Sequence, residues 1–376
     1  MGIRRSRKLL VRGALLLVVL ILLGLVVVGC VEGTTVPKGW SGGTIVDGTL
    51  FIGSMEGKLV TISTVDGSRL RAVALGYTAP AAGFGCSAPA PKTVAIYGSP
   101  AVSDDLVYVG GYNGIVSAFA FDRDEPRWVY PRQGSISGNI VGGLTVAQGK
   151  VYFGSSEGKV YALDAAEGYK QWEFETTGKI WSTPAVDGNT LFIGSFDKKL
   201  YAIDASTGKE KWHFATEGAI VSAPVIYNNT VYVGSFDRYL YALDANDGSL
   251  KWKFQAENWL WAKPVVSNGA VYAASLGGKV YALNAESGDK LVEVDLGSPV
   301  SSNPVLAGNS VILATEDGVV YNLAPDSNQP RRLVSLAEKV YAPLSASQGM
   351  VYIHSALDKL YVVDAQSGAK REFNIK

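Results

Sequence analysis

The segment VYFGSSEGKVYALDA, residues 151–165, decides the fold because copies of it recur along the chain. Seven further copies, three of them close and the others degraded, start at Leu50, Val107, Leu191, Val231, Val271, Val311 and Val351. The last six starts are 40 residues apart, and the two earlier gaps are 57 and 44 residues. A period of this length indicates stacked supersecondary units of one kind.

Each copy predicts four β-strands. Val151 and Phe153 alternate with Tyr152 and Gly154, which is the period of a strand, and the SSEG stretch at 155–158 forms a turn before the next apolar segment. A third strand covers the region of Gln171–Phe174, and a fourth runs from Ile180 to Val186 before the next copy begins. Four short antiparallel strands per repeat are typical of a propeller blade, so the sequence predicts an all-β, eight-bladed β-propeller of four-stranded antiparallel blades.

Prolines and tryptophans recur at fixed places in the repeat. Prolines stand seven residues before the start of five copies, at Pro100, Pro184, Pro224, Pro264 and Pro304. Because proline cannot donate to a β-ladder, the strand after it is expected at a sheet edge, innermost in the ring. Tryptophans lie 21 residues after the start of four copies, at Trp128, Trp172, Trp212 and Trp252. We expect these rings to cover apolar surface between blades.

The N-terminus predicts export. Residues 1–12 hold five basic residues and no acid, and an unbroken apolar stretch runs from 13 to 29 before Cys30. The sequence VVGC at 27–30 resembles a bacterial lipobox, in which Cys30 is lipidated. The alternative is an uncleaved signal anchor, since 17 apolar residues approach the length of a spanning helix. Both alternatives place the rest of the chain outside the cytoplasmic membrane.

Charge and cysteine content limit the partners. Removal of residues 1–29 takes five basic residues from a chain with 34 basic and 34 acidic residues, which leaves a formal charge of about −5. A mildly acidic domain is not expected to bind nucleic acid. The second cysteine, Cys86, lies in a segment rich in Pro, Ala and Gly, residues 78–91, read either as a disordered excursion or as an arm that contacts a partner.

The repeat VYVGSFDRYLYALDANDGSLKWKF, residues 231–254, resembles the PQQ-like (quinoprotein-type) β-propeller repeat. The resemblance covers nearly all the chain after residue 39, although Val292 and Arg332 replace the outer-strand tryptophan in two blades. With the N-terminal features it divides the chain into three expected regions: residues 1–29 as a lipoprotein signal peptide or signal anchor, 30–38 as a tether, and 39–376 as the propeller. In layout the chain is closest to the BamB-like outer-membrane assembly lipoproteins, a branch of binding propellers.

No catalytic or metal site is predicted. The quinoprotein dehydrogenases, which this repeat also resembles, carry vicinal cysteines and calcium ligands, and the chain has no such cysteine pair. His213 is expected on an outer strand facing solvent, and His354 as a packed structural residue, with a channel-lining ligand as its alternative. Strand-ending turns carry Asp164, Asp204, Asp244, Asn284 and Asp364, which we expect to cap their own backbone.

Aromatic residues recur ten positions before the copies, at the entrance to the innermost strand. Five of the eight positions are aromatic: Trp40, Tyr97, Trp181, Trp261 and Tyr341, with Trp259 near one of them. We expect them either to form a binding collar at one mouth of the channel or to fill gaps between blades. The hairpin turns add apolar tips at Met55, Tyr112, Phe196, Phe236 and Leu276. Exposed apolar clusters of this kind mark interaction surfaces.

These features favour a lipid-anchored, extracytoplasmic binding or scaffold protein without a cofactor, held at the membrane through the Cys30 lipid or an N-terminal helix. The resemblance implies a role in assembly or delivery of membrane proteins, with a protein or peptide partner in the envelope. The ring is expected to act as a monomer within a complex, at the outer membrane or the outer face of the cytoplasmic membrane. The alternatives are a PQQ-dependent oxidoreductase using PQQ and calcium, and a carbohydrate-binding envelope lipoprotein. The ring could also close through pairing of 34–36 with 371–375.

Overall fold

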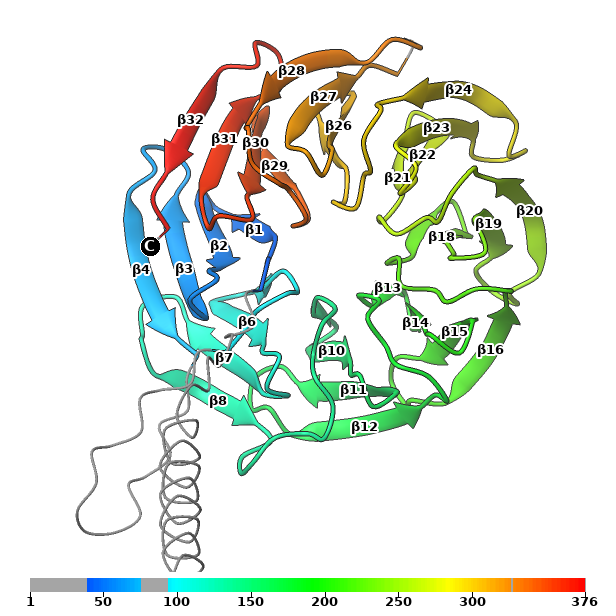
Figure 1. Cartoon of the computed structure of the whole chain (residues 1–376). Coiled ribbons are helices and arrows are strands. Elements are labelled where there is room, and N and C mark those ends of the chain that lie inside the picture. Colours follow the sequence, from blue (N-terminus) through cyan, green and yellow to red (C-terminus); the bar gives the residue numbers. More distant parts are fainter. Residues whose placement is uncertain (1–38, 76–93, 326, 376) are drawn as a thin grey trace, which may run out of the picture. The chain divides into compact units, whose positions relative to one another are not determined.

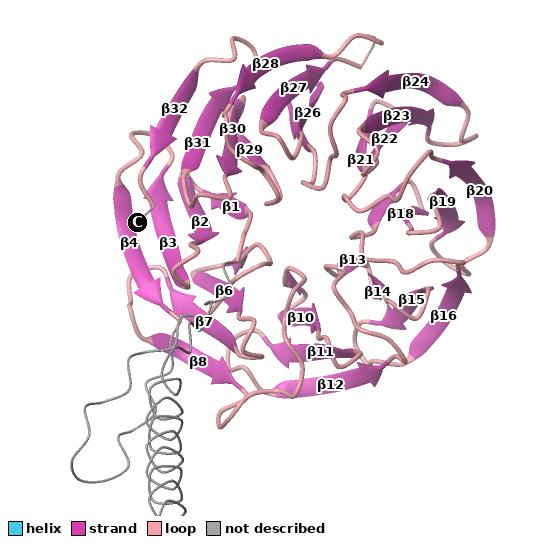
Figure 2. Ribbon diagram, viewed as in Figure 1, coloured by secondary structure: helices cyan, strands magenta, loops and turns pink. Residues whose placement is uncertain are grey.

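The computed structural model describes residues 39–75, 94–325 and 327–375. These residues form eight four-stranded antiparallel sheets arranged as the blades of a ring, as predicted (Figure 1). Figure 2 shows strands and loops throughout this part of the chain. No helix in the described residues has the length and apolar character needed to cross a membrane. The predictions for Cys30, Cys86 and 34–36 fall outside the described residues.

The strands follow each other in chain order within every blade, from the innermost to the outermost. Blades 1 to 4 consist of β1 (Gly43–Val46), β2 (Thr49–Gly53), β3 (Lys58–Ser63) and β4 (Arg69–Ala74); β5 (Ala101–Ser103), β6 (Leu106–Gly110), β7 (Val116–Ala120) and β8 (Pro126–Tyr130); β9 (Thr145–Ala147), β10 (Lys150–Gly154), β11 (Lys159–Asp164) and β12 (Lys170–Glu175); and β13 (Ala185–Asp187), β14 (Thr190–Gly194), β15 (Lys199–Asp204) and β16 (Glu210–Ala215).

The other four blades repeat this pattern. Blades 5 to 8 consist of β17 (Val225–Tyr227), β18 (Thr230–Gly234), β19 (Tyr239–Asp244) and β20 (Leu250–Gln255); β21 (Val265–Ser267), β22 (Ala270–Ala274), β23 (Lys279–Asn284) and β24 (Lys290–Asp295); β25 (Val305–Ala307), β26 (Ser310–Ala314), β27 (Val319–Leu323) and β28 (Arg331–Ser335); and β29 (Ser345–Ser347), β30 (Met350–His354), β31 (Leu360–Asp364) and β32 (Lys370–Phe373).

The innermost strands are shorter than the sequence pattern predicts. A strand was expected from Ile180 to Val186, but β13 comprises only Ala185–Asp187. Pro184 directly precedes that strand and has no amide hydrogen for a ladder, so pairing begins only after it. The prolines thus precede innermost strands at the sheet edge, which confirms the prediction made from them.

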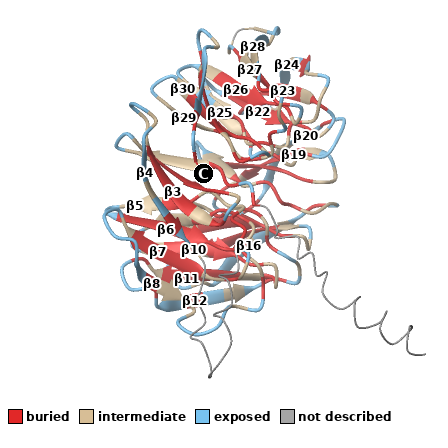
Figure 3. Ribbon diagram, turned by 60° about the vertical axis from the view of Figure 1, so that its left-hand side comes forward, coloured by how far each residue is buried: buried red, intermediate tan, exposed pale blue. Residues whose placement is uncertain are grey.

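Apolar surface between neighbouring blades forms the core. Side chains of β10 and β11 pack against those of β14 and β15 in one such interface, where Tyr152, Val160 and Leu191 are fully buried. Similar clusters recur around the ring. Figure 3 shows buried residues along the inner strands, whereas exposed residues lie on the outermost strands and the turns. The ring is therefore held together by the hydrophobic effect between blades.

The outer-strand tryptophans of blades 2 to 5 donate hydrogen bonds to the next blade. The Trp172 indole nitrogen donates to the carbonyl of Ala205 at 3.0 Å, and its ring lies over Gly208. A Cβ atom on Gly208 would come within 2.7 Å of the indole, and its φ of 74° also favours glycine. The other three tryptophans bond in the same way, from Trp128, Trp212 and Trp252 to Ala165, Ala245 and Ala285. Their structural role is confirmed.

Arginine takes the place of tryptophan at two interfaces. Arg71 of blade 1 donates to the carbonyls of Ala120 at 2.7 Å and Phe121 at 3.0 Å, and Arg331 of blade 7 donates to the carbonyl of Ala365 at 3.2 Å. Phe121 and Ala365 hold the acceptor position that the indoles use in blades 2 to 5. These interfaces therefore share a hydrogen bond to one carbonyl of the next blade, donated by either a tryptophan or an arginine of the outer strand.

Blades 8 and 1 meet at the closure of the ring. Phe373 and Ile375 pack there against Leu50 and Ile62. His354 is 2% exposed, and its Nδ1 lies 2.9 Å from the carbonyl oxygen of Ser41. In the described residues the last blade takes all four of its strands from the C-terminal part of the chain.

Candidate functional site

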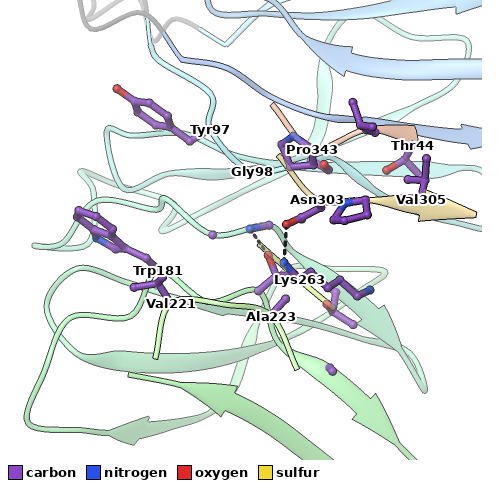
Figure 4. Close-up of a pocket in the computed structure, with 18 of the residues that line it drawn as sticks. Thr44, Tyr97, Gly98, Trp181, Val221, Ala223, Lys263, Asn303, Val305 and Pro343 are labelled. Carbon is purple, nitrogen blue, oxygen red and sulfur yellow. Dashed lines mark hydrogen bonds between the residues drawn. The ribbon is translucent and has the colours of Figure 1, made fainter. Parts of the chain in front are cut away.

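The eight positions ten residues before the copies line one central channel. The channel has a volume of about 1090 Å³. Its lining includes all of these positions: Trp40, Tyr97, Val141, Trp181, Val221, Trp261, Ser301 and Tyr341. In the close-up, Tyr97 and Trp181 lie at one end, Thr44 and Val305 at the other, and Lys263 and Asn303 between them (Figure 4). Of the two arrangements expected for the aromatic residues, the structure places them in the channel.

Local sequence explains why these side chains face the channel. The residue before Trp181 is Ile180, which is fully buried, and the residue after it is Ser182, which is 1% exposed. Extended backbone turns successive side chains to opposite sides. Two neighbours buried in the blade interface therefore direct Trp181 toward the ring axis.

The first aromatic cluster comprises Trp40, Tyr97, Tyr112 and Tyr341, from blades 8, 1 and 2. Ring centroids of Trp40 lie 4.9 Å from Tyr97 and 5.6 Å from Tyr341, and Tyr97 lies 5.3 Å from Tyr112. Trp40 remains 39% exposed and Tyr112 36% exposed. Burial, followed by the charge of Tyr112, raises the pKa of Tyr97, so its hydroxyl keeps its proton at neutral pH.

The second aromatic cluster comprises Trp181, Phe196, Phe236, Trp259 and Trp261, from blades 4, 5 and 6. Trp181 packs edge-on to Phe196 at 4.8 Å, and Phe236 stacks on Trp259 at 4.8 Å. Trp181 and Trp261 approach to 6.4 Å although blade 5 separates their blades. Trp259 is 48% exposed. In a ring of eight blades this cluster lies opposite the first one, across the channel mouth.

Two predicted turn tips lie outside both clusters. The Met55 amide donates to Asp358 at 2.9 Å, next to the closure of the ring. The Leu276 amide donates to the carbonyl of Trp259 at 2.9 Å, which ties this turn to the segment that carries the second cluster. Both side chains are partly buried. The structure thus brings together nine of the eleven aromatic and turn-tip residues that the sequence singles out.

Sequence reasoning missed Lys263, the one charged residue among the described residues of the channel lining. It lies two positions after Trp261, where the other blades carry Gly, Ser, Thr, Ala, Asn or Pro. Alignment of the eight copies at this position would have revealed it. Its side chain is exposed to the water of the channel. The protein atoms around the channel nevertheless displace part of the bulk water near its ammonium group, and this desolvation lowers the pKa of Lys263.

The other candidate residues have structural roles. His213 is exposed on β16 and pairs with Glu210 at 2.7 Å, as expected. His354 is packed rather than channel-lining, which confirms the structural alternative. The strand-ending carboxylates accept from their own turns; for example, Asp164 accepts from the amides of Ala166 and Glu167.

The lining does not fit calcium-bound PQQ. Calcium takes six to eight oxygen ligands, commonly including carboxylates. None of the described residues that line the channel is an Asp or a Glu. Nor do three or more His, Cys, Asp or Glu residues gather into a metal-holding group anywhere in the described part of the chain. The channel presents aromatic rings, small polar groups and one ammonium group instead.

Solved structures resemble this propeller as a whole. One is the crystal structure of BamB from Moraxella catarrhalis, with a TM-score of 0.69, 21% sequence identity, and coverage of 86% of this chain and 93% of that one. Another is the computationally designed Ika8 protein, with a TM-score of 0.72, 16% identity, and coverage of 86% and 96%. At these identities the likeness shows the fold.

Two curated relatives are also BamB proteins. The outer membrane protein assembly factors BamB of Escherichia coli and of Salmonella typhimurium are each 33% identical over 93 residues. The match covers 23% of this chain and 24% of each relative, so it spans about a quarter of their length.

A family model matches far more of the chain. The model described as outer membrane protein assembly factor BamB matches residues 32–179, 156–260 and 256–371. Together these ranges run from residue 32 to 371, from before the first strand into the last strand of the eighth blade. The chain therefore belongs to the PQQ-type β-propeller family of outer membrane protein assembly factor BamB.

Proposed function

We propose that this chain is a lipid-anchored, extracytoplasmic scaffold that binds a protein or peptide partner and serves a BamB-like role in the assembly or delivery of membrane proteins. The proposal assigns it no catalytic step and no cofactor. The family and the name of the curated relatives support the assembly role. The lipobox-like sequence that ends at Cys30 supports the anchor.

The observation that carries the proposal is the pair of aromatic clusters on opposite sides of one channel mouth. Each cluster leaves a tryptophan substantially exposed, Trp40 in the first and Trp259 in the second. Aromatic anchors dominate the binding energy of protein interfaces because they bury a large area at a low entropy cost. An extended peptide that crosses the mouth could place an apolar side chain on each cluster.

Affinity purification of the full-length protein from detergent-solubilised membranes tests this role. We expect recovery of a β-barrel insertase component, identified by mass spectrometry, with the wild-type protein. Trp40→Ala and Trp259→Ala should each reduce that recovery several-fold. Tyr169→Ala provides a matched control, because Tyr169 is 54% exposed but lies outside both clusters. Equal recovery with all variants would contradict the aromatic face as the binding site.

The alternative functions have separate tests. A quinoprotein would reduce an artificial dye after addition of PQQ and calcium, and we expect no reduction above background. A carbohydrate-binding protein would retain defined glycans on an array, with a change in tryptophan fluorescence. A positive result in either assay would replace the scaffold proposal.

Intact mass spectrometry of the mature protein tests the anchor. We expect a chain that begins at Cys30 and carries acyl groups, and we expect Cys30→Ser to abolish the acylation. A species that retains Met1 would show an uncleaved helical anchor instead.

A further inference from the structure

We propose that the channel receives one carboxylate of the bound peptide and that the ammonium group of Lys263 is its partner. This inference rests on the proposed peptide binding and specifies which peptides bind. A carboxylate can come from the C-terminus of a chain or from an Asp or Glu side chain, and both present the same group to Lys263.

Lys263 is a cation without a protein counter-charge. Among the described residues no carboxylate lies within 4.0 Å of its ammonium group. By contrast, Lys279 on the outside of the same blade contacts both Glu257 and Glu293. The backbone amide of Lys263 donates to Asn303 Oδ1 at 2.8 Å, which fixes the backbone at this point of the channel. A partly desolvated cation gains stability from an anion that displaces its water.

Other channel groups also favour an acceptor. The indole nitrogen of Trp181 and the hydroxyl of Ser301 are buried without a hydrogen-bond partner, and both residues line the channel. An indole nitrogen can only donate. Asn303 uses its carbonyl oxygen for Lys263, so its amide nitrogen is directed elsewhere as a donor. The Asn303 amide therefore offers an oxygen acceptor a second donor beside Lys263. The Trp181 and Ser301 donors are covered by protein atoms and would have to turn toward the channel to reach that acceptor.

Charge argues for a single carboxylate on an otherwise neutral ligand. One lysine balances one negative charge, whereas a phosphate or a polyanion would leave charge uncompensated in the channel. The turns that surround the mouth carry acidic residues next to the apolar tips, including Glu56, Asp197 and Asp237. These would repel an acidic segment while they leave a lone carboxylate inside the channel unaffected. The volume of about 1090 Å³ is large enough for a chain end or an extended side chain.

Three synthetic peptides test the inference by isothermal titration calorimetry with the full-length protein in detergent. The first is acetyl-Phe-Gly-Phe-Gly-Phe with a free C-terminus, the second is its C-terminal amide, and the third is the amide with Glu at the centre. We expect the first or third peptide to bind at least about tenfold more tightly than the second, because a charge-assisted bond contributes about 1.5 kcal/mol or more. Comparison of the first and third distinguishes a chain end from a side chain.

Variants assign the effect to Lys263. In Lys263→Met the preference for the carboxylate should disappear, while affinity for the neutral amide stays within about twofold. Lys209→Met removes an exposed lysine from an outer turn and should leave the preference intact. Equal binding of charged and neutral peptides to the wild type would overturn the carboxylate site but leave aromatic peptide docking in place.

A small-molecule arm separates the two proposals. Phenylacetate should shift the side-chain NMR signals of Lys263, whereas phenylacetamide should not. If no peptide binds but phenylacetate produces this shift, the peptide proposal fails and the anion site stands. If phenylacetate leaves the Lys263 signals unchanged at saturating concentration, the anion site is wrong regardless of the peptide result.

Discussion

The shared carbonyl of Ala205 allows a quantitative test of how the blades are fastened. This oxygen accepts from the Trp172 indole at 3.0 Å and from the Tyr152 hydroxyl at 3.1 Å. Replacement of one donor by phenylalanine leaves the carbonyl bonded to the other. Replacement of both leaves a buried carbonyl without a partner, which costs about 1–3 kcal/mol beyond the lost bonds.

The double-mutant cycle therefore has a predicted sign and size. Tyr152→Phe should lower the free energy of unfolding by about 1 kcal/mol for its lost hydrogen bond. Trp172→Phe should lower it by about 2 kcal/mol, because it also removes buried ring volume. The loss in the double variant should exceed the sum of the two single losses by about 1–3 kcal/mol. Urea unfolding followed by far-ultraviolet circular dichroism measures the free energy of unfolding of the two single variants and the double variant. This signal, unlike tryptophan fluorescence, does not depend on Trp172.

The neighbouring interface provides the control. Phe192 stands in blade 4 where Tyr152 stands in blade 3, so the Ala245 carbonyl accepts from Trp212 with no tyrosine beside it. Trp212→Phe alone should therefore destabilise the protein more than Trp172→Phe, because it leaves the Ala245 carbonyl without a protein donor. A cycle at Tyr152 and Trp172 that is additive within about 0.5 kcal/mol would refute the shared-acceptor reasoning.

Two further predictions concern ionisable groups. His354 Nε2 lies 3.0 Å from the buried Asp358 carboxylate, which also accepts from the Met55 amide. His354→Phe should lower the free energy of unfolding by about 1.5–3 kcal/mol because this carboxylate loses its imidazole partner, whereas His213→Phe on the surface should change it by less than about 0.5 kcal/mol. Equal effects in urea unfolding would contradict this. The amide and then the hydroxyl of Ser367 lower the pKa of Asp364 below its unfolded value, so this carboxylate stabilises the fold above about pH 4 and the contribution is lost as pH falls through its folded pKa. Asp364→Asn removes that titration but keeps a side chain that caps the turn, as Asn284 does in blade 6. The difference in free energy of unfolding between wild type and variant should therefore become smaller from pH 7 to pH 2. A difference that stays constant over this range would contradict the assignment.

The fold was predictable from the sequence because each blade packs a similar set of apolar residues against the next blade. Trp128 and its equivalents recur at one spacing, and each bonds to the same carbonyl of the next blade. Pro184 and its equivalents indicated which strand lies at the sheet edge, but they did not predict the residue at which its pairing begins. That boundary depends on where the connecting segment leaves the blade core: burial alternates from Ile180 to Pro184 and stops alternating where β13 begins, which the residue types alone do not show.

The candidate site was predictable in part. The collar positions could be placed around one channel from the repeat alone. Their division into two clusters could not, because the contact of Trp181 with Trp261 joins blades 4 and 6 across blade 5, whose equivalent position holds Val221. His354 stood out from its equivalents in sequence, but its partner Asp358 did not, since acidic residues are common in these turns.

Comparison of equivalent positions around the ring separates structural residues from candidate binding residues. Where several interfaces make the same contact, the same residue or the same kind of donor recurs, as with the four tryptophans and Arg71. A residue that differs from those at the equivalent positions of the other blades is explained either by a contact within the protein or by a ligand. His354 has a local reason, because it bonds to Ser41 and Asp358 at the closure of the ring. Lys263 has no such partner among the described residues, since only its backbone amide is bonded. An aqueous channel lowers the cost of that lone cation but does not explain its presence in the lining, and a ligand carboxylate does.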